Sequence, residues 1–137
     1  MVDQTLILRK LSNLEAYLVQ IEEYRTISLE AYLNDWKTQR IIERTLQMMV
    51  ETCSDIAGHI IADHKYRVPT GYADTFQVLE ENKVLDKTLA ESLSKMAKFR
   101  NVVVHDYDQV DGEIVIGILR KYLPDFSSFK DAVVALL

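Results

Sequence analysis

The sequence predicts an all-α fold, an antiparallel four-helix bundle with short accessory helices. Apolar residues recur at intervals of three and four over two long segments, which is the spacing of one helix face. The 137 residues include only four glycines and two prolines, so few residues interrupt long elements. No segment shows the convincing apolar–polar alternation that is typical of a β-strand. We therefore expect helices packed on helices.

Two expected helices have the clearest apolar faces. The first begins after Asp3, whose side chain can cap it, and the second extends from about Trp36 to His64. Narrow apolar faces of this kind can pack as antiparallel partners. A short helix around Ser28–Leu33 is expected between them. The residues of the two faces are Ile7, Leu11, Leu14, Leu18 and Ile21, and then Ile42, Leu46, Met49, Cys53, Ile56 and Ile60.

The second half of the chain begins at a clear break, Val68-Pro69-Thr70-Gly71. A short helix around Tyr72–Glu81 is expected to follow. Another helix should start at Asp86 and continue through Arg100. The β-branched run Val102–Val104 disfavours helix, so we expect this helix to end or kink there.

The last part of the chain should be helical as well. Asp111 can cap a helix that continues through Tyr122. Pro124 either kinks that helix or starts a separate last one that ends near Leu137. No linker, repeat or low-complexity tract divides the sequence, and its length suits one compact domain over residues 1–137.

Composition excludes several classes of protein. A net charge of −5 argues against broad, non-specific nucleic-acid binding, but not against an enzyme that grips one or two phosphates. The one cysteine, Cys53, cannot form an internal disulfide, which favours a reducing compartment. No apolar run has the length of a membrane span, and Met1–Gln4 does not begin a signal peptide. We expect a cytoplasmic protein without membrane contact.

The segment from Phe99 to Tyr107 contains the groups best suited to chemistry. In a continuous helix Arg100 and His105 would point about 140° apart, because they are five residues apart at 3.6 residues per turn. If the helix ends near Val104, His105 can turn back towards Arg100. In an extended link His105 and Tyr107 project to the same side. We therefore expect a cleft lined by a guanidinium, an imidazole and a phenol.

These residue types suit RNA cleavage without a metal ion. Arg100 can bind phosphate oxygens through a planar fork of donors and stabilise charge on a pentacoordinate phosphate. His105 can accept a proton from a ribose 2′-hydroxyl or donate one to the leaving 5′-oxygen. A homodimer would add a second set of these groups at a two-fold interface. No cofactor is expected, and no metal site either, since His59 and His64 lie off one helix face.

The pattern Arg100-Asn101-x-x-x-His105-x-Tyr107 resembles the Arg-x4-His-x-Tyr motif of HepT toxins in the HEPN superfamily. The resemblance extends over the whole chain, in its length and its helix order. It implies a dimeric helical ribonuclease in which Arg100 and His105 are catalytic, Asn101 is a supporting polar residue and two motifs face a shared cleft. Further matching segments lie within residues 39–56 and 76–81.

The resemblance also implies a biological role. HepT-like toxins are metal-independent endoribonucleases of type VII-like toxin–antitoxin pairs, and transfer RNA is the expected type of target. Their partner is a MntA-like minimal nucleotidyltransferase antitoxin, which transfers AMP from ATP onto the motif tyrosine, in this sequence Tyr107. A nucleotide on Tyr107 would fill the cleft and put negative charge where the RNA phosphate must lie.

Plainer interpretations stay open on the residues alone. Arg100 and His105 could be a helix-end ion pair and a surface histidine, and Tyr107 could lie at the edge of the core. A solvated helix face is expected for Arg40, Glu43, Arg44, Gln47 and Glu51, with Gln47 and Glu51 paired at a spacing of four. The two arginines could instead contact RNA or the motif residues. The alternative function is a non-catalytic helical subunit that binds a nucleotide or a nucleotidyltransferase partner. RNA cleavage by the purified chain would separate the two.

Overall fold

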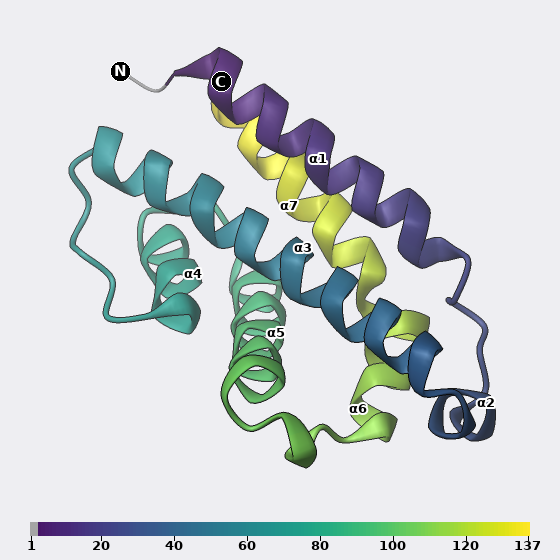
Figure 1. Cartoon of the computed structure of the whole chain (residues 1–137). Coiled ribbons are helices and arrows are strands. Elements are labelled where there is room, and N and C mark those ends of the chain that lie inside the picture. The colour runs from purple at the N-terminus through teal and green to yellow at the C-terminus, as the bar shows by residue number, and fades with distance from the viewer. Residues whose placement is uncertain (1–2) are drawn as a thin grey trace.

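The computed structural model describes residues 3–137, and every regular element among them is helical. The helices α1 and α3 lie side by side and antiparallel, as predicted, and α7 runs beside them (Figure 1). The four main helices are α1 (Gln4–Glu22), α3 (Trp36–Asp63), α5 (Lys87–His105) and α7 (Leu123–Leu136). The short ones are α2 (Leu29–Asn34), α4 (Tyr72–Glu81), the 3₁₀ turn η1 (Tyr107–Gln109) and α6 (Gly112–Gly117). The predicted all-α fold is confirmed.

Short polar side chains begin most of the helices. Each supplies an oxygen to a backbone N–H that has no partner inside the helix, which stabilises a helix by about 1 kcal/mol. The predicted caps Asp3 and Asp111 are confirmed, at 3.1 Å from the Leu6 nitrogen and 2.9 Å from the Glu113 nitrogen. The side chains that cap in this way are Asp3, Ser28, Asp35, Asp86 and Asp111.

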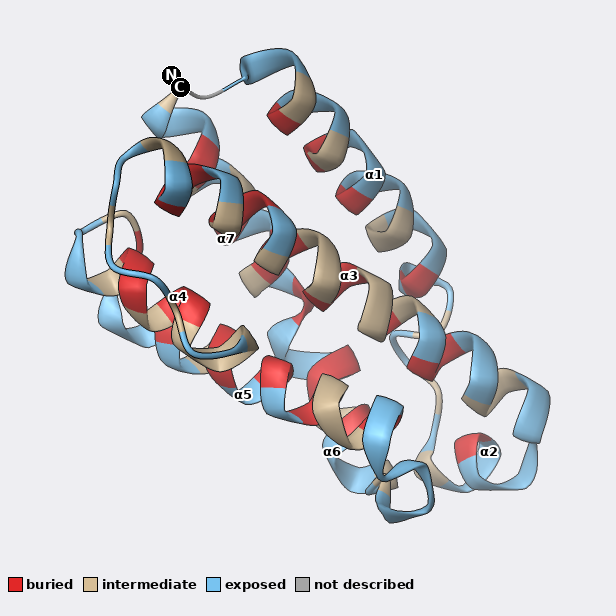
Figure 2. Cartoon of the chain, turned by 60° about the vertical axis from the view of Figure 1, so that its left-hand side comes forward, coloured by how far each residue is buried: buried red, intermediate tan, exposed pale blue. Residues whose placement is uncertain are grey.

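The predicted apolar faces meet in the core. All the residues of the α3 face are buried, and so are those of α1 except Leu18, which is half-buried. Buried positions follow the sides of α1, α3 and α5 that face the other helices (Figure 2). Cys53 is fully buried among them, and this burial raises the pKa of its thiol. Its predicted place on the apolar face of α3 is confirmed.

The C-terminal third shows how the helix continues around Pro124. The chain stays helical from Gly112 to Leu136, with a π-helical turn η2 (Ile118–Tyr122) just before Pro124. Proline has no N–H to donate and sits at the start of α7, where a helix needs no such donor. The last helix is therefore joined to α6 through a local distortion and not through a loop.

No helix within residues 3–137 combines the length and the apolar character that crossing a membrane requires.

An arginine fastens the α3–α4 linker to α4. The Arg67 guanidinium donates to both oxygens of Asp74, at 2.7 and 2.8 Å, and to both oxygens of Glu81, at 2.9 Å each. Asp74 also accepts from the Thr70 backbone N–H at 2.9 Å. Arg67 holds the pKa of both carboxyl groups below their ordinary values, and the Thr70 N–H lowers that of Asp74 further. This ion-pair cluster of Arg67, Asp74 and Glu81, called the clasp below, therefore depends on ionised carboxylates.

We expect acid to release this clasp. A carboxyl group whose pKa is lowered by folding stabilises the fold above its unfolded pKa, and that contribution is lost as the pH falls through the folded pKa. Asp74→Asn should therefore lower the urea midpoint at pH 7. The deficit relative to the parent should shrink as the pH falls below the ordinary aspartate pKa of 3.8. Asp131→Asn, at an exposed position of α7, is the control. A deficit that does not change with pH would contradict the prediction.

Candidate active site

The motif residues lie at the end of α5 and in the turn after it. We expected the helix to end near Val104, so that His105 could turn back, but α5 continues through His105. Arg100 and His105 therefore point about 140° apart in one subunit. The extended link expected before Tyr107 is wrong too, because Tyr107 begins the 3₁₀ turn η1. Helical hydrogen bonding has overridden the weak helix preference of the valine run.

Arg100 is held from three sides. Its Nε donates to a Glu51 carboxylate oxygen at 3.5 Å, and its Nη1 donates to the Asn101 side-chain oxygen at 3.1 Å. The guanidinium also stacks on the Tyr72 ring, 4.3 Å from its centroid. Only 11% of the Arg100 side chain is exposed. These contacts fix the plane of the guanidinium.

Glu51 belongs to a row of polar side chains on α3. Gln47 donates to Glu51 at 3.0 Å, which confirms the pair expected from their spacing of four. We call Arg40, Arg44, Gln47 and Glu51 the polar strip of α3. Intervals of four, three and four residues place all of them on one side of the helix.

The other end of the polar strip meets Tyr107. The Arg40 guanidinium carbon lies 4.3 Å from the centroid of the Tyr107 ring. Tyr107 is 40% exposed, so it stays partly accessible to solvent beside Arg40. Arg40 therefore contacts a motif residue, which was the alternative to a purely solvated position. Arg40 and Glu51 are eleven positions apart on α3, so the residues that contact Tyr107 and Arg100 lie roughly 16 Å apart along this helix.

Glu43 departs from its expected place on a solvated face. It is 5% exposed, and it accepts a hydrogen bond from the Tyr32 hydroxyl at 2.6 Å. Its other oxygen lies 3.5 Å from Arg40 Nη1. Burial and the neighbouring Glu43 raise the pKa of the Tyr32 phenol well above 10, so the hydroxyl keeps its proton and donates. The helical spacing of Glu43 to the buried Leu46 and Val50 is the signal that could have revealed it.

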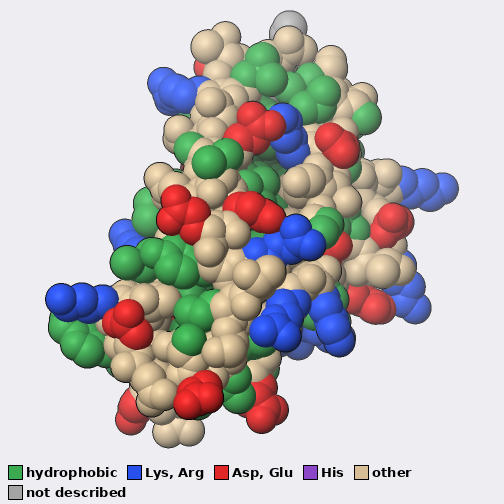
Figure 3. Space-filling model, turned by 90° about the vertical axis from the view of Figure 1, so that its right-hand side faces the viewer, with side chains coloured by type: hydrophobic (Ala, Val, Ile, Leu, Met, Phe, Trp, Pro, Cys, Tyr) green, Lys and Arg blue, Asp and Glu red, His purple; other side chains and the backbone are tan. Residues whose placement is uncertain are grey.

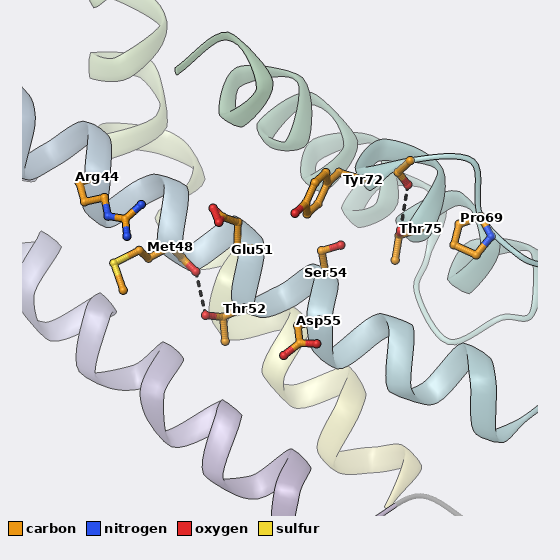
Figure 4. A pocket seen from close by; sticks show the side chains of 10 residues that line it. Arg44, Met48, Glu51, Thr52, Ser54, Asp55, Pro69, Tyr72 and Thr75 are labelled. Carbon is orange, nitrogen blue, oxygen red and sulfur yellow. Dashed lines mark hydrogen bonds between the residues drawn. The ribbon is translucent and has the colours of Figure 1, made fainter. Parts of the chain in front are cut away.

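An open pocket of about 650 Å³ lies between α3 and α4, beside the Arg100–Tyr72 stack. In Figure 4 the Glu51 carboxylate lies between Arg44 and Tyr72 along this pocket. Arg44 is exposed and makes no ion pair or hydrogen bond within residues 3–137. The pocket thus offers one unengaged guanidinium, an aromatic ring and a carboxylate next to Arg100.

His105 is exposed, and no contact joins it to Arg100 in the described part of the chain. The contacts of Arg100 with Glu51 and Tyr72 are the features that sequence reasoning missed. Their partners lie far apart in the sequence, which helical spacing along one segment cannot reveal.

One face of the molecule (Figure 3) shows how its charged side chains are distributed. On the face drawn in Figure 3, basic, acidic and hydrophobic side chains are interspersed, without a broad basic area. On that face, a phosphate would have to bind individual basic side chains. No three His, Cys, Asp or Glu side chains gather into a candidate metal site among residues 3–137.

The fold and this site define a class: a small helical domain with arginine, histidine and tyrosine side chains suited to phosphate chemistry at the end of one helix. Comparison with known proteins identifies the family. A family model described as "Ribonuclease HepT-like" matches residues 14–133. The chain belongs to this HepT-like ribonuclease family.

Individual relatives agree. The chain is 33% identical over 104 residues to an mRNA nuclease HepT of Shewanella oneidensis, covering 76% of this chain and 78% of the relative. It is 29% identical over 110 residues to a tRNA nuclease HepT of Aphanizomenon flos-aquae, covering 80% and 75%. Among solved structures, it is similar to a tri-AMPylated Shewanella oneidensis HEPN toxin in complex with an MNT antitoxin. That match has a TM-score of 0.87 and 29% identity, and it covers 98% of this chain and 99% of the other.

Proposed function

We propose that this chain is the toxin of a type VII-like toxin–antitoxin pair, a cytoplasmic metal-independent endoribonuclease with RNA, above all transfer RNA, as its substrate. Arg100 and His105 are the catalytic residues, and Asn101 supports Arg100. The observation that carries the proposal is the similarity of almost the whole chain to a HEPN toxin solved with its antitoxin. The buried, stacked guanidinium of Arg100 adds a group preorganised to bind a phosphate.

We further propose that the chain acts as a homodimer of one HEPN-like domain each. Arg100 and His105 point apart within one subunit, so one subunit alone does not gather both groups around one phosphate. A two-fold axis near the end of α5 would place the exposed His105 of one subunit beside the motif of the other. This arrangement gives the reaction the acid and the base that it needs.

Silencing acts on Tyr107. A MntA-like nucleotidyltransferase antitoxin transfers AMP from ATP to the Tyr107 hydroxyl, forming a phosphodiester and releasing pyrophosphate. The accessibility of the Tyr107 ring supports this assignment. The added phosphate would compete with RNA for the guanidinium groups of the site.

The purified chain should cleave total transfer RNA in buffer that contains EDTA, because its proposed chemistry uses side chains in place of a metal ion. If no cleavage is seen, intact mass should show an increase in units of AMP that is absent from the Tyr107→Phe variant. Tyr24→Phe, at another tyrosine, serves as the control and should keep the mass increase. An unmodified chain that leaves RNA intact would sink the proposal and favour a nucleotide- or partner-binding subunit.

A further inference from the structure

Arg40 is held in place by a buried acid. Glu43 is 5% exposed, and one of its oxygens has no hydrogen-bond partner within residues 3–137. The positive charge beside that oxygen is Arg40, at 3.5 Å. Removing a charged partner from a buried carboxylate is costly, because the remaining charge loses both water and its counter-charge. Arg40 is therefore confined near Glu43.

Tyr32 fixes the acid in turn. Its hydroxyl donates to the second Glu43 oxygen at 2.6 Å, and the Tyr32 side chain is 2% exposed. Glu43 thus cannot rotate freely to follow a moving arginine. This series of contacts begins at Tyr32 on α2, passes through Glu43 and Arg40 on α3, and ends at the surface beside Tyr107.

The Arg40 guanidinium still has N–H groups free to donate. Within residues 3–137 Arg40 makes the ion pair with Glu43 and the stack on Tyr107, and no hydrogen bond uses its N–H groups. About half of its side chain is exposed. A planar cation fixed on an aromatic ring with its remaining N–H groups open to solvent suits a phosphodiester oxygen. A merely structural counter-ion for Glu43 would not need to lie over Tyr107.

We propose that Arg40 is a phosphate-binding residue for the RNA strand at Tyr107, and that Glu43 and Tyr32 are its positioning residues. The inference rests on the proposed function, because RNA must reach Tyr107 for Arg40 to bind it. It adds a second phosphate contact to that of Arg100, at the other end of the polar strip, where Arg40 and Glu51 lie roughly 16 Å apart along α3. A strand bound at both ends of the strip would pass Arg44 and Gln47.

The test is RNA binding by a chain that cannot cleave. A labelled single-stranded RNA is titrated with the double variant His105→Ala, Tyr107→Phe, in EDTA, over a series of KCl concentrations. The phenylalanine keeps a ring beneath Arg40 but cannot carry AMP. Adding Arg40→Ala should weaken binding about tenfold and reduce the slope of log K against log salt by about 0.7. The matched control is Arg25→Ala, an exposed arginine also paired with a glutamate three residues away, and it should change neither quantity.

Glu43→Gln separates positioning from simple charge. If Arg40 acted only through its charge, removing the neighbouring acid would strengthen RNA binding. Positioning predicts weaker binding, with Tyr32→Phe changing affinity in the same direction. Urea unfolding of each variant establishes that the chain is folded at the temperature of the titration. Stronger binding by Glu43→Gln would overturn the positioning role.

The inference and the proposed function can fail separately. Cleavage of RNA by the wild-type chain, together with unchanged affinity and salt slope on Arg40→Ala, would overturn the inference and leave the ribonuclease standing. RNA binding that depends on Arg40, together with no cleavage by a wild-type chain whose intact mass shows no AMP, would overturn the ribonuclease and leave the inference standing. A third outcome is that Arg40→Ala lowers RNA affinity only in chains that retain Tyr107 and whose intact mass shows AMP. Arg40 then binds the phosphate of the attached AMP, and the proposed RNA contact is refuted.

Discussion

Arg100→Ala should reduce the rate of RNA cleavage by about 10²–10³-fold, the usual effect of removing one preorganised donor from a developing anion. His105→Ala should reduce it by about 10²–10⁴-fold, because a positioned acid or base is lost. Arg100→Lys should recover little, because an ammonium group neither stacks flat on Tyr72 nor donates through a planar fork. Cleavage of transfer RNA in EDTA, followed over time on a gel, measures all three.

The matched control is Lys98→Ala, an exposed cation two residues away on another side of α5. It should cleave as the parent does. Circular dichroism and the elution volume in size-exclusion chromatography establish that each variant keeps the parental fold and assembly. An Arg100→Ala variant that cleaves at the parental rate would remove Arg100 from the catalytic site.

Phe76→Ala should cost about 3–5 kcal/mol of unfolding free energy, a large share of the roughly 5–15 kcal/mol that stabilises a typical domain. Phe76 on α4 and Phe129 on α7 are fully buried, and their rings meet edge to face with centroids 6.1 Å apart. Removing one ring leaves a cavity between two helices that share no other aromatic contact within residues 3–137. Urea unfolding followed at 222 nm measures the loss.

Val134→Ala serves as the control, since Val134 lies on α7 with 45% of its surface exposed. Its unfolding free energy should stay within about 0.5 kcal/mol of the parent. The urea m-value should be unchanged in both variants, because neither alters the extent of the core. A loss below about 1 kcal/mol for Phe76→Ala would mean that the surrounding helices close the cavity.

The sequence predicted those parts of the fold that depend on neighbours along the chain. The spacing of Ile42, Leu46 and Met49 on one helix face and the cap at Asp3 are local features, so the residues themselves reveal them. The end of α5 was placed one residue early, because the valine run was given more weight than the hydrogen bonds that continue through His105. Helix ends are set by such small differences in free energy.

Residue type and spacing singled out the candidate site residues but did not predict their arrangement. Arg100, Asn101, His105 and Tyr107 stood out by type and spacing, and the roles proposed for them await experiment. Contacts between distant segments were out of reach. Nothing in the spacing along α5 indicates that Arg100 stacks on Tyr72. Such contacts form only when the helices pack, so the spacing of residues along one segment does not reveal them.

Because α3 is uninterrupted, the number of residues between Arg40 and Glu51 is constrained by their contacts. One helix carries both Arg40 and Glu51, so it acts as a ruler that fixes their separation and relative direction. Inserting a single residue between them would turn one by about 100° with respect to the other and detach it from its contact. Between Arg40 and Glu51, a substitution can therefore be tolerated where an insertion or a deletion cannot. The signature of this site is then a pair of matched spacings, Arg-x10-Glu on α3 and Arg-x6-Tyr from α5 into η1.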